Sequence, residues 1–159
     1  MIACRSDLNY PVNRYQMKKL FLLFTLLLSM NAMASNEVDL YDTQGNPVVY
    51  IAIDDGMTIY SWGGQPDAYL KRGQNNEFDV YGFNGKHLGW FIKGKLIDHD
   101  GYAVCGTKES VSMPRLPPLK SLKSLKPLKS LPELPPLLPL MKNSFGETDC
   151  ASFVEAGRS

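Results

Sequence analysis

Residues 38–107 repeat one short pattern of apolar and polar positions four times. Each copy has an apolar, tyrosine-rich run, a polar turn that holds a glycine, and a second apolar run. The copies read VDLYDTQGNPVVYI, MTIYSWGGQPDAYL, FDVYGFNGKHLGWF and KLIDHDGYAVCGT. Aromatic and β-branched residues favour strands, and glycine supplies the positive φ of a tight turn. Each copy therefore predicts a β-hairpin.

The four copies align on one glycine each, and we call these the turn glycines: Gly45, Gly64, Gly85 and Gly101. The position five residues before them is always aliphatic: Leu40, Ile59, Val80 and Leu96. The position four residues after them is mostly small: Val49, Ala68, Gly89 and Cys105. Small residues suit a crowded place near a symmetry axis. The position two residues before them falls in the predicted turns, where we expect partial exposure: Thr43, Trp62, Phe83 and His99.

The spacing of the turn glycines limits the architecture. They lie 19, 21 and 16 residues apart, which is too short for a propeller blade of roughly 40 residues. A single hairpin is unstable alone, whereas four hairpins around an axis bury their apolar faces and leave no bare edge strand. The sequence therefore predicts an all-β module over residues 37–108, with four β-hairpin repeats arranged as a pseudo-four-fold shallow barrel.

The repeat, with its blocks VYGFNGKHLGWF and DHDG, resembles the bacterial four-fold beta-flower family over about residues 38–108. The resemblance implies a shallow barrel of four hairpins, similar to the Tubby C-terminal barrel without its central helix. It implies no activity. The likeness to Tubby suggests lipid or membrane surfaces only by analogy of fold. The fourth copy departs from the pattern, with Ile97 in place of tyrosine and Gly106 in place of an aromatic residue.

The segment before the repeat has the pattern of an export signal. Lys18 and Lys19 form a positive region, Leu20–Leu28 is apolar, and Ala32-Met33-Ala34 is a small-residue cleavage site. This is typical of a secretory signal peptide at residues 17–34, and the apolar run is too short for a membrane span. We therefore expect Met17 to be the natural start, residues 1–16 to be an upstream extension outside the protein, and the mature chain to be exported to the periplasm or secreted.

Residues 112–142 follow a different period, with leucine at every third position from Leu116 to Leu140. The stretch also contains eight prolines, which forbid a continuous α-helix. A period of three is that of polyproline II and places the leucines on one edge. Lysines fall on a second edge: Lys120, Lys123, Lys126 and Lys129. Two interpretations stay open, a disordered Pro/Leu/Lys-rich linker and a docking strip whose lysines contact an anionic membrane or a partner. Residues 143–159 are a loose tail or a small helix and stay unassigned.

Charge is divided unevenly between the repeat and this tail. Residues 35–111 carry 6 basic and 11 acidic side chains, whereas residues 112–142 carry 6 and 1. The acidic repeat argues against nucleic acid as a partner, because phosphate binding needs clustered lysine and arginine. Exposed charges are screened beyond about 8 Å, and a surface ion pair contributes under about 1 kcal/mol. We therefore expect an extended tail that leaves the barrel free.

Two sets of residues could form a bond or a reactive site. Cys105 and Cys150 remain in the mature chain, and in an oxidising compartment they form either a disulfide or two separate thiols, Cys105 being buried. Asp98, His99 and Asp100 coincide with the fourth turn. Turn aspartates commonly bind their own backbone, and the alternative is a metal or acid–base site. No catalytic, cofactor or metal motif predicts an enzyme elsewhere.

Trp62, Phe83 and Trp90 are the remaining candidate binding residues. They either pack inside a small barrel or form an aromatic rim that grips a ligand or a membrane interface. We expect a non-enzymatic binding module of the bacterial envelope or extracellular space, with a lipid surface or a protein as its partner. The alternative function is a small hydrolase or metal-dependent enzyme that uses the turn of Asp98, His99 and Asp100.

Overall fold

The computed structural model describes residues 36–73 and 77–158. The chain divides into two units, Met1–Ala34 and Ser35–Ser159, and the described residues lie in the second. The predicted signal peptide and the segment before it therefore lie outside the described residues.

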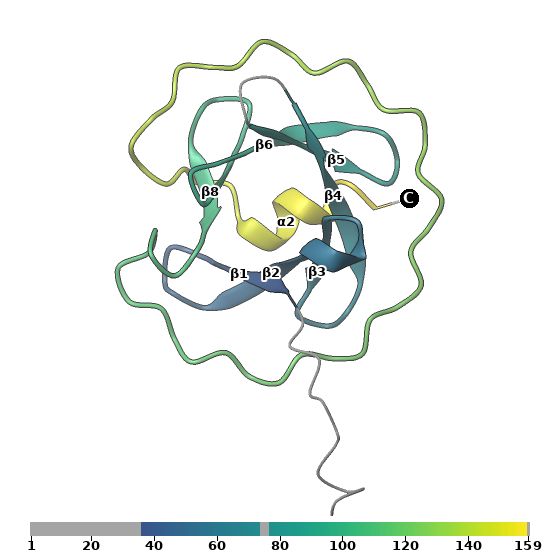
Figure 1. Ribbon diagram of the computed structural model, residues 1–159. Coiled ribbons are helices and arrows are strands. Elements are labelled where there is room, and N and C mark those ends of the chain that lie inside the picture. Colours follow the sequence, from purple (N-terminus) through teal and green to yellow (C-terminus); the bar gives the residue numbers. More distant parts are fainter. Residues whose placement is uncertain (1–35, 74–76, 159) are drawn as a thin grey trace, which may run out of the picture. The chain divides into compact units, whose positions relative to one another are not determined.

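Eight antiparallel strands close into a barrel in which every strand pairs with its neighbours in sequence (Figure 1). They are β1 (Glu37–Tyr41), β2 (Pro47–Ala52), β3 (Thr58–Ser61), β4 (Pro66–Arg72), β5 (Phe78–Gly82), β6 (His87–Ile92), β7 (Lys95–Ile97) and β8 (Ala103–Gly106). A short 3-10 turn, η1 (Ile53–Asp55), joins the first two hairpins. The barrel closes where Tyr41 of β1 pairs with Gly106 of β8.

Each sequence repeat forms one hairpin, so the predicted barrel of four hairpins is confirmed. The local geometry repeats as well, because the strand register shifts at the same place in every hairpin, between the fifth and fourth residues before the turn glycine. Such a bulge bends the strand and increases its twist, which helps a small sheet to close. The pseudo-four-fold symmetry therefore extends to the backbone.

The barrel interior is built from the two columns that the repeat singled out. The aliphatic residue five before each glycine pairs with the small residue four after it: Leu40 with Val49, Ile59 with Ala68, Val80 with Gly89, and Leu96 with Cys105. The four aliphatic side chains are fully buried. Alternate residues of each strand point outward and carry the tyrosines and charged side chains.

A short helix, α2 (Cys150–Glu155), fills the centre of the ring (Figure 1). The Asp149 side chain caps it by accepting a hydrogen bond of 2.9 Å from the backbone N–H of Ser152. Phe153 and Val154 are buried in the same cluster as the barrel core. The structure adds this helix to the helix-free barrel that the resemblance implies, and the missing side chain at Gly89 leaves room for the Phe153 ring, which lies 3.1 Å from where a Cβ atom would stand. No helix within residues 36–73 or 77–158 has the length and apolar character needed to cross a bilayer.

Candidate functional site: an encircling strap and its lysine receptors

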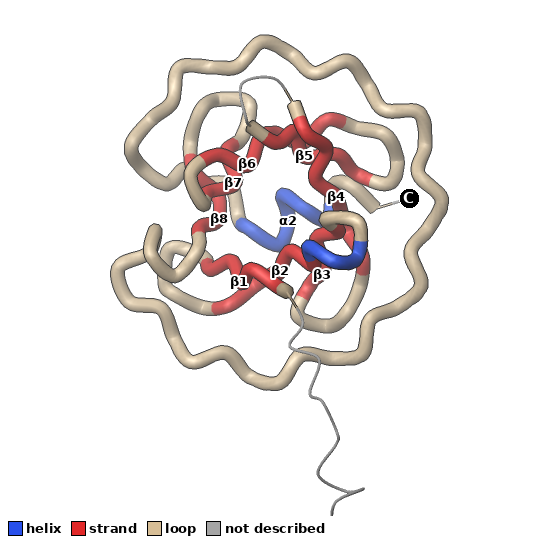
Figure 2. The backbone as a smooth tube through the Cα atoms, in the orientation of Figure 1, coloured by secondary structure: helices blue, strands red, loops and turns tan. Residues whose placement is uncertain are grey.

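Residues 112–142, which we call the strap, run around the outside of the barrel and return to the ring at α2 (Figure 2). They contain no helix or strand. They leave after β8, pass each hairpin in turn, and end near the point where they began, where Phe145 forms a bridge with Ala103. The prediction of a tail that leaves the barrel free is therefore wrong. The contacts described next are the physical reason.

The strap meets the four hairpins with a period of nine residues. At each turn glycine, one strap N–H donates a hydrogen bond of 2.8–2.9 Å to the glycine carbonyl. The pairs are Arg115 with Gly45, Ser124 with Gly64, Glu133 with Gly85, and Lys142 with Gly101. We call residues 112–120, 121–129 and 130–138 the first, second and third strap units. These backbone bonds recur at every hairpin and join residues far apart in the sequence, so the strap is held by more than scattered surface charges.

The turn glycines make room for the strap. A Cβ atom on any of them would lie 1.9–2.3 Å from a strap carbonyl oxygen. The φ angles of the four glycines lie between 79° and 87°. Residues with a side chain rarely adopt this backbone conformation. Glycine is therefore required twice at each site, for the turn and for the close approach of the second chain.

Aromatic residues of the repeat form the outer faces between neighbouring hairpins. Tyr50 and Tyr60 stack with ring centroids 5.6 Å apart, and Tyr69 and Tyr81 stack at 6.0 Å. The strap crosses these faces, which is why the four tyrosines are almost completely buried although they point away from the core. The outward-facing tyrosines of the repeat thus contact the strap as well as their neighbours in the sheet.

The three predicted aromatic binding residues lie on three separate faces. Trp62 packs edge-on against Tyr50 and donates a hydrogen bond of 3.2 Å from Nε1 to the carbonyl of Pro118. Phe83 packs against Tyr69 and is fully buried, so the expected exposure of its turn position is wrong there. Trp90 is also buried. These side chains therefore do not converge on one exposed rim.

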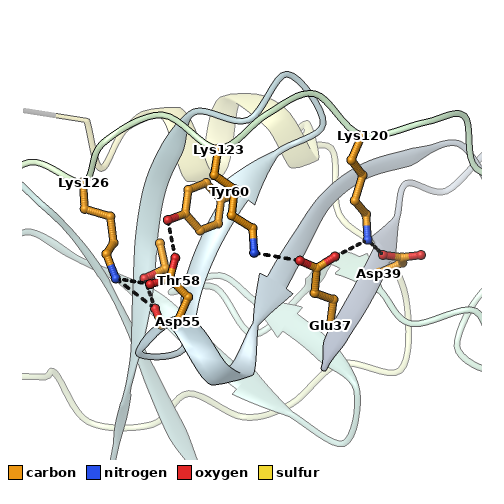
Figure 3. Close-up of polar contacts among 8 residues, drawn as sticks. All are labelled: Glu37, Asp39, Asp55, Thr58, Tyr60, Lys120, Lys123 and Lys126. Carbon is orange, nitrogen blue, oxygen red and sulfur yellow. Dashed lines mark hydrogen bonds and ion pairs between the residues drawn. The ribbon is translucent and has the colours of Figure 1, made fainter. Parts of the chain in front are cut away.

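Lys120 of the strap enters a receptor of two carboxylates from β1 and two aromatic rings, one from β2 and one from the turn after β3. Figure 3 shows the two carboxylates, Glu37 and Asp39, beside the ammonium group of Lys120. Its Nζ lies 2.8 Å from Glu37 Oε2 and 2.6 Å from Asp39 Oδ1. The same atom lies 4.3 Å from the centroid of the Tyr50 ring and 5.0 Å from that of Trp62. Burial opposes the charge of Lys120, but bonding to the two carboxylates outweighs it and raises the pKa. This is the geometry of a combined ion pair and cation–π contact.

Two neighbouring lysines extend this network. Lys123 Nζ lies 2.7 Å from Glu37 Oε1, and Lys126 forms an ion pair with Asp55 (Figure 3). Although burial disfavours ionised Glu37, the two lysines bound to it hold its pKa below the usual value. Lys126 and the hydroxyl of Tyr60, which donates a bond of 2.5 Å, lower the pKa of Asp55. The carboxylates are therefore ionised partners of the strap at neutral pH.

Lys129 meets an aromatic ring without a carboxylate. Its Nζ lies 3.7 Å from the centroid of the Tyr69 ring. Burial, together with the nearby charge of Lys126, lowers the pKa of Lys129. The lysine edge, one of whose two interpretations was contact with a membrane or partner, is thus directed at the barrel through all four lysines.

The leucines of the strap point the other way. The nine leucines of the three-residue period are each 91–97% exposed, whereas Leu138, which lies outside that period, is 43% exposed. We call the nine the leucine girdle: Leu116, Leu119, Leu122, Leu125, Leu128, Leu131, Leu134, Leu137 and Leu140. The strap therefore turns its lysines and its hydrogen-bonding N–H groups inward and its largest apolar side chains outward.

Comparison with models of known families identifies one match, 4-fold beta flower protein, over residues 38–154. The chain belongs to this family. The matched residues of the beta flower include the barrel, the whole strap and α2 as far as Val154. The comparisons with curated proteins and with solved structures found no match.

In this beta flower, the side chain of Asp98 binds the backbone of its own turn. Asp98 Oδ1 accepts hydrogen bonds from the N–H groups of Asp100 and Tyr102, at 3.0 and 2.9 Å. His99 Nε2 lies 2.9 Å from His87 Nδ1 rather than against either aspartate. Burial and the neighbouring His99 lower the pKa of His87. In the described part of the chain, no three His, Cys, Asp or Glu side chains are grouped as metal ligands would be.

A disulfide between Cys105 and Cys150 joins the elements on either side of the strap, with 5.4 Å between the Cα atoms. Cys105 belongs to β8, and Cys150 begins α2 at the centre of the ring. Residues 105–150 of the beta flower thus form a covalently closed loop that includes the entire strap.

The carboxylates that receive the lysines were not anticipated from the sequence. A signal was present, because Glu37 and Asp39 lie eight and six residues before Gly45 and the same spacing recurs once more in the repeat. The strap also carries a nine-residue signal, with serine at 112, 121 and 130. The nine-residue period is hard to detect because nine is a multiple of the more obvious three-residue leucine period.

Proposed function

We propose that this beta flower is a non-enzymatic binding module that docks on the surface of a lipid membrane through its leucine girdle. The observation that carries the proposal is that nine leucines are each 91–97% exposed on one continuous segment. Large exposed apolar patches on soluble proteins mark protein or membrane interaction sites.

The girdle has no role in packing the barrel. Fully burying one leucine side chain stabilises by about 1.5–3 kcal/mol, and these leucines gain almost none of this within the chain, because they remain exposed. The strap is instead seated by its backbone bonds and by Lys120 and Lys123, which face the barrel. A partner that buries even a few leucines would therefore gain free energy that the fold does not use.

A lipid surface suits the spacing of these side chains better than a preformed protein groove. Leucines three residues apart on an extended chain are separated by roughly 9–10 Å, so neighbouring leucines do not pack on one another. Mobile acyl chains can fill the intervening space, whereas a protein groove would need a matching series of pockets. Since three strap lysines pair with barrel carboxylates, we expect binding to depend little on anionic lipid.

The expected export of the chain supports the same proposal, because an envelope or secreted protein meets membrane surfaces. The alternative of a hydrolase or metal-dependent enzyme has weaker support. It required Asp98 and His99 to act together, and Asp98 binds the turn while His99 pairs with His87.

Vesicle flotation of the Ser35–Ser159 unit tests the proposal. We expect it to float with zwitterionic phosphatidylcholine vesicles and to float only slightly better when anionic lipid is added. A variant with all nine girdle leucines changed to serine should stay at the bottom of the gradient. A matched variant with methionine at the same nine positions should still float, because methionine is also apolar.

Circular dichroism and the intact disulfide provide the folding control, and both variants should pass because the girdle side chains are exposed. Three variants with serine at residues 116, 119 and 122, at 125, 128 and 131, or at 134, 137 and 140 locate the arc that meets the bilayer. Equal flotation of the folded nine-serine variant and the parent would exclude the girdle as the membrane contact. Failure of the parent to float would leave a protein partner as the better explanation.

A further inference from the structure

The third hairpin repeats the receptor that holds Lys120. On the first hairpin, Glu37, Asp39 and Tyr50 lie eight before, six before and five after the turn glycine, and the same three positions on the third hairpin hold Glu77, Asp79 and Trp90. The strand register is also the same, because Asp39 pairs with Tyr50 and Asp79 pairs with Trp90. Two carboxylates and one aromatic ring therefore recur in one arrangement.

The strap does not fill this second receptor with a cation. The ninth residue of the first strap unit is Lys120, that of the second is Lys129, and that of the third is Leu138. The third unit is nevertheless seated, because the carbonyl of Glu133 accepts a bond of 3.0 Å from the Tyr81 hydroxyl and its carboxylate accepts one of 3.0 Å from the N–H of His87. Leucine thus stands where the equivalent residue elsewhere carries an ammonium group.

An open cleft lies at this position. It has a volume of about 590 Å³, and its lining includes Glu77, Asp79, Trp90 and Leu138. Asp79 retains acceptor capacity there. Its closest ionisable contact among the described residues is His87 Nε2 at 3.5 Å, which is too long for a good hydrogen bond.

We propose that this cleft is a binding site for a primary ammonium group on an alkyl chain, such as a lysine side chain or a small alkylamine. The ammonium bonds to Asp79, as Lys120 bonds to Asp39, and lies against Trp90, the indole being the ring that attracts cations most strongly. Glu77 supplies the second carboxylate, as Glu37 does. The alkyl chain of the ligand contacts Leu138 and the prolines beside it, Pro135 and Pro136.

The cleft also contains two cations of its own, Lys71 and Arg72. Lys71 Nζ lies 5.7 Å from the centre of the Tyr81 ring, and the Arg72 guanidinium lies 5.8 Å from that of Phe78. They balance the charges of Glu77 and Asp79, so a single free ammonium should bind weakly, with a Kd in the millimolar range, roughly 1–10 mM. Selectivity comes from the Trp90 ring and the Asp79 carboxylate together rather than from net charge.

The two tryptophans provide an internal comparison for the test. In proton–nitrogen correlation spectra of the Ser35–Ser159 unit, the indole N–H signals of Trp62 and Trp90 are distinguished with a Trp62→Phe variant. Titration with n-butylammonium chloride should shift the Trp90 signal and leave Trp62 unmoved, because Lys120 already lies against Trp62. Sodium chloride at equal ionic strength and n-butanol serve as the salt and neutral-chain controls.

Two substitutions test the assigned contacts. Asp79→Asn should weaken butylammonium binding by about tenfold, the usual loss when a charged hydrogen-bond partner is neutralised, whereas Asp54→Asn on the exposed η1 turn should have no effect. Leu138→Lys should place an internal ammonium in the cleft, shift the Trp90 signal without ligand, and abolish the response to butylammonium. If Leu138→Lys does not fold, the Asp79→Asn comparison still decides the matter.

A second probe, Nα-acetyl-lysine amide, separates the sources of the ammonium group. Binding of both probes assigns the site to alkylammonium groups in general, and binding of acetyl-lysine amide alone assigns it to lysine in a polypeptide. The proposal is overturned if neither probe moves Trp90, if Trp62 responds equally, or if Asp79→Asn binds as tightly as the parent. The experiment involves no lipid, so its outcome is independent of the vesicle test.

Discussion

The backbone N–H of Ser124 donates a hydrogen bond of 2.8 Å to the carbonyl oxygen of Gly64, although the two residues are sixty positions apart in the chain. The next residue along the barrel, Gln65, bonds through Nε2 to the hydroxyl of the same serine at 3.0 Å. One strap residue is thereby fixed on one hairpin turn through both its backbone and its side chain.

Replacing Gly64 with alanine should release the strap at this turn. The backbone strain of a side chain at φ 82° costs about 1–2 kcal/mol, and the new Cβ would lie 2.1 Å from the carbonyl oxygen of Leu122. We expect a loss of at least about 2 kcal/mol in the free energy of unfolding, measured by urea denaturation. Gly63→Ala is the matched control, since its Cβ would meet nothing closer than 3.7 Å. Equal stability of the two variants would contradict the packing role of Gly64.

The disulfide between Cys105 and Cys150 should contribute strongly to stability. The two cysteines are 45 residues apart. In the loop-entropy description, closing a loop of this length stabilises the folded chain by about 4 kcal/mol. We expect the Cys105→Ser, Cys150→Ser double variant to unfold at a markedly lower urea concentration than the oxidised parent. Because both cysteines are buried, alkylation in denaturant without reductant, followed by intact mass measurement, checks the bond directly. Two alkylated thiols without prior reduction would contradict it.

The ion pairs between the strap lysines and the barrel carboxylates should break in acid. The pKa of Glu37 and the pKa of Asp55 are lowered in the folded chain by their lysine partners. Their contribution to stability is therefore complete above the unfolded values near 4 and is lost as the pH falls through the lowered folded values. Glu37→Gln should cost about 1 kcal/mol at pH 7 and should flatten the fall in stability below pH 4.

Urea midpoints between pH 7 and pH 2 provide the measurement. Glu147→Gln is the control, because Glu147 is exposed and lies outside the strap, in the segment that precedes α2. The interpretation is wrong if Glu37→Gln and Glu147→Gln have the same pH dependence.

The expected export predicts a defined N-terminus. A signal peptide that ends in Ala32-Met33-Ala34 should be removed after Ala34. The mature protein should therefore begin at Ser35, as intact mass or N-terminal sequencing of the exported form will show. A cytoplasmic product that retains Met17 would refute the signal.

The barrel could be predicted because its repeat combines short-range signals. Glycine at a tight turn, aliphatic residues such as Leu40 facing inward and tyrosines such as Tyr50 facing outward all follow from strand alternation and turn chemistry. These preferences act within one hairpin of about 14 residues. They say which face is buried, but not whether a second layer covers the outer face.

The strap could not be predicted by the same means. We expected the strap to stay apart from the barrel because a single surface ion pair contributes little free energy. The ion pairs of Lys120 alone would not have changed that expectation. Its neighbours Arg115 and Ser124 add backbone bonds at the turn glycines, and such bonds leave almost no trace in composition. The position of α2 was hidden for a related reason, because Phe153 reaches the core only through long-range packing and the disulfide.

The period of nine gives the strap a fixed length relative to the circumference of the barrel. Nine residues of fully extended chain reach at most about 30 Å, and one such span must connect each turn glycine to the next. Deleting three strap residues would preserve the three-residue period of the leucines. Every later strap N–H would nevertheless be three residues out of register with its turn glycine. A family member with an additional hairpin would need nine additional strap residues, so the two halves of the sequence can change in size only together.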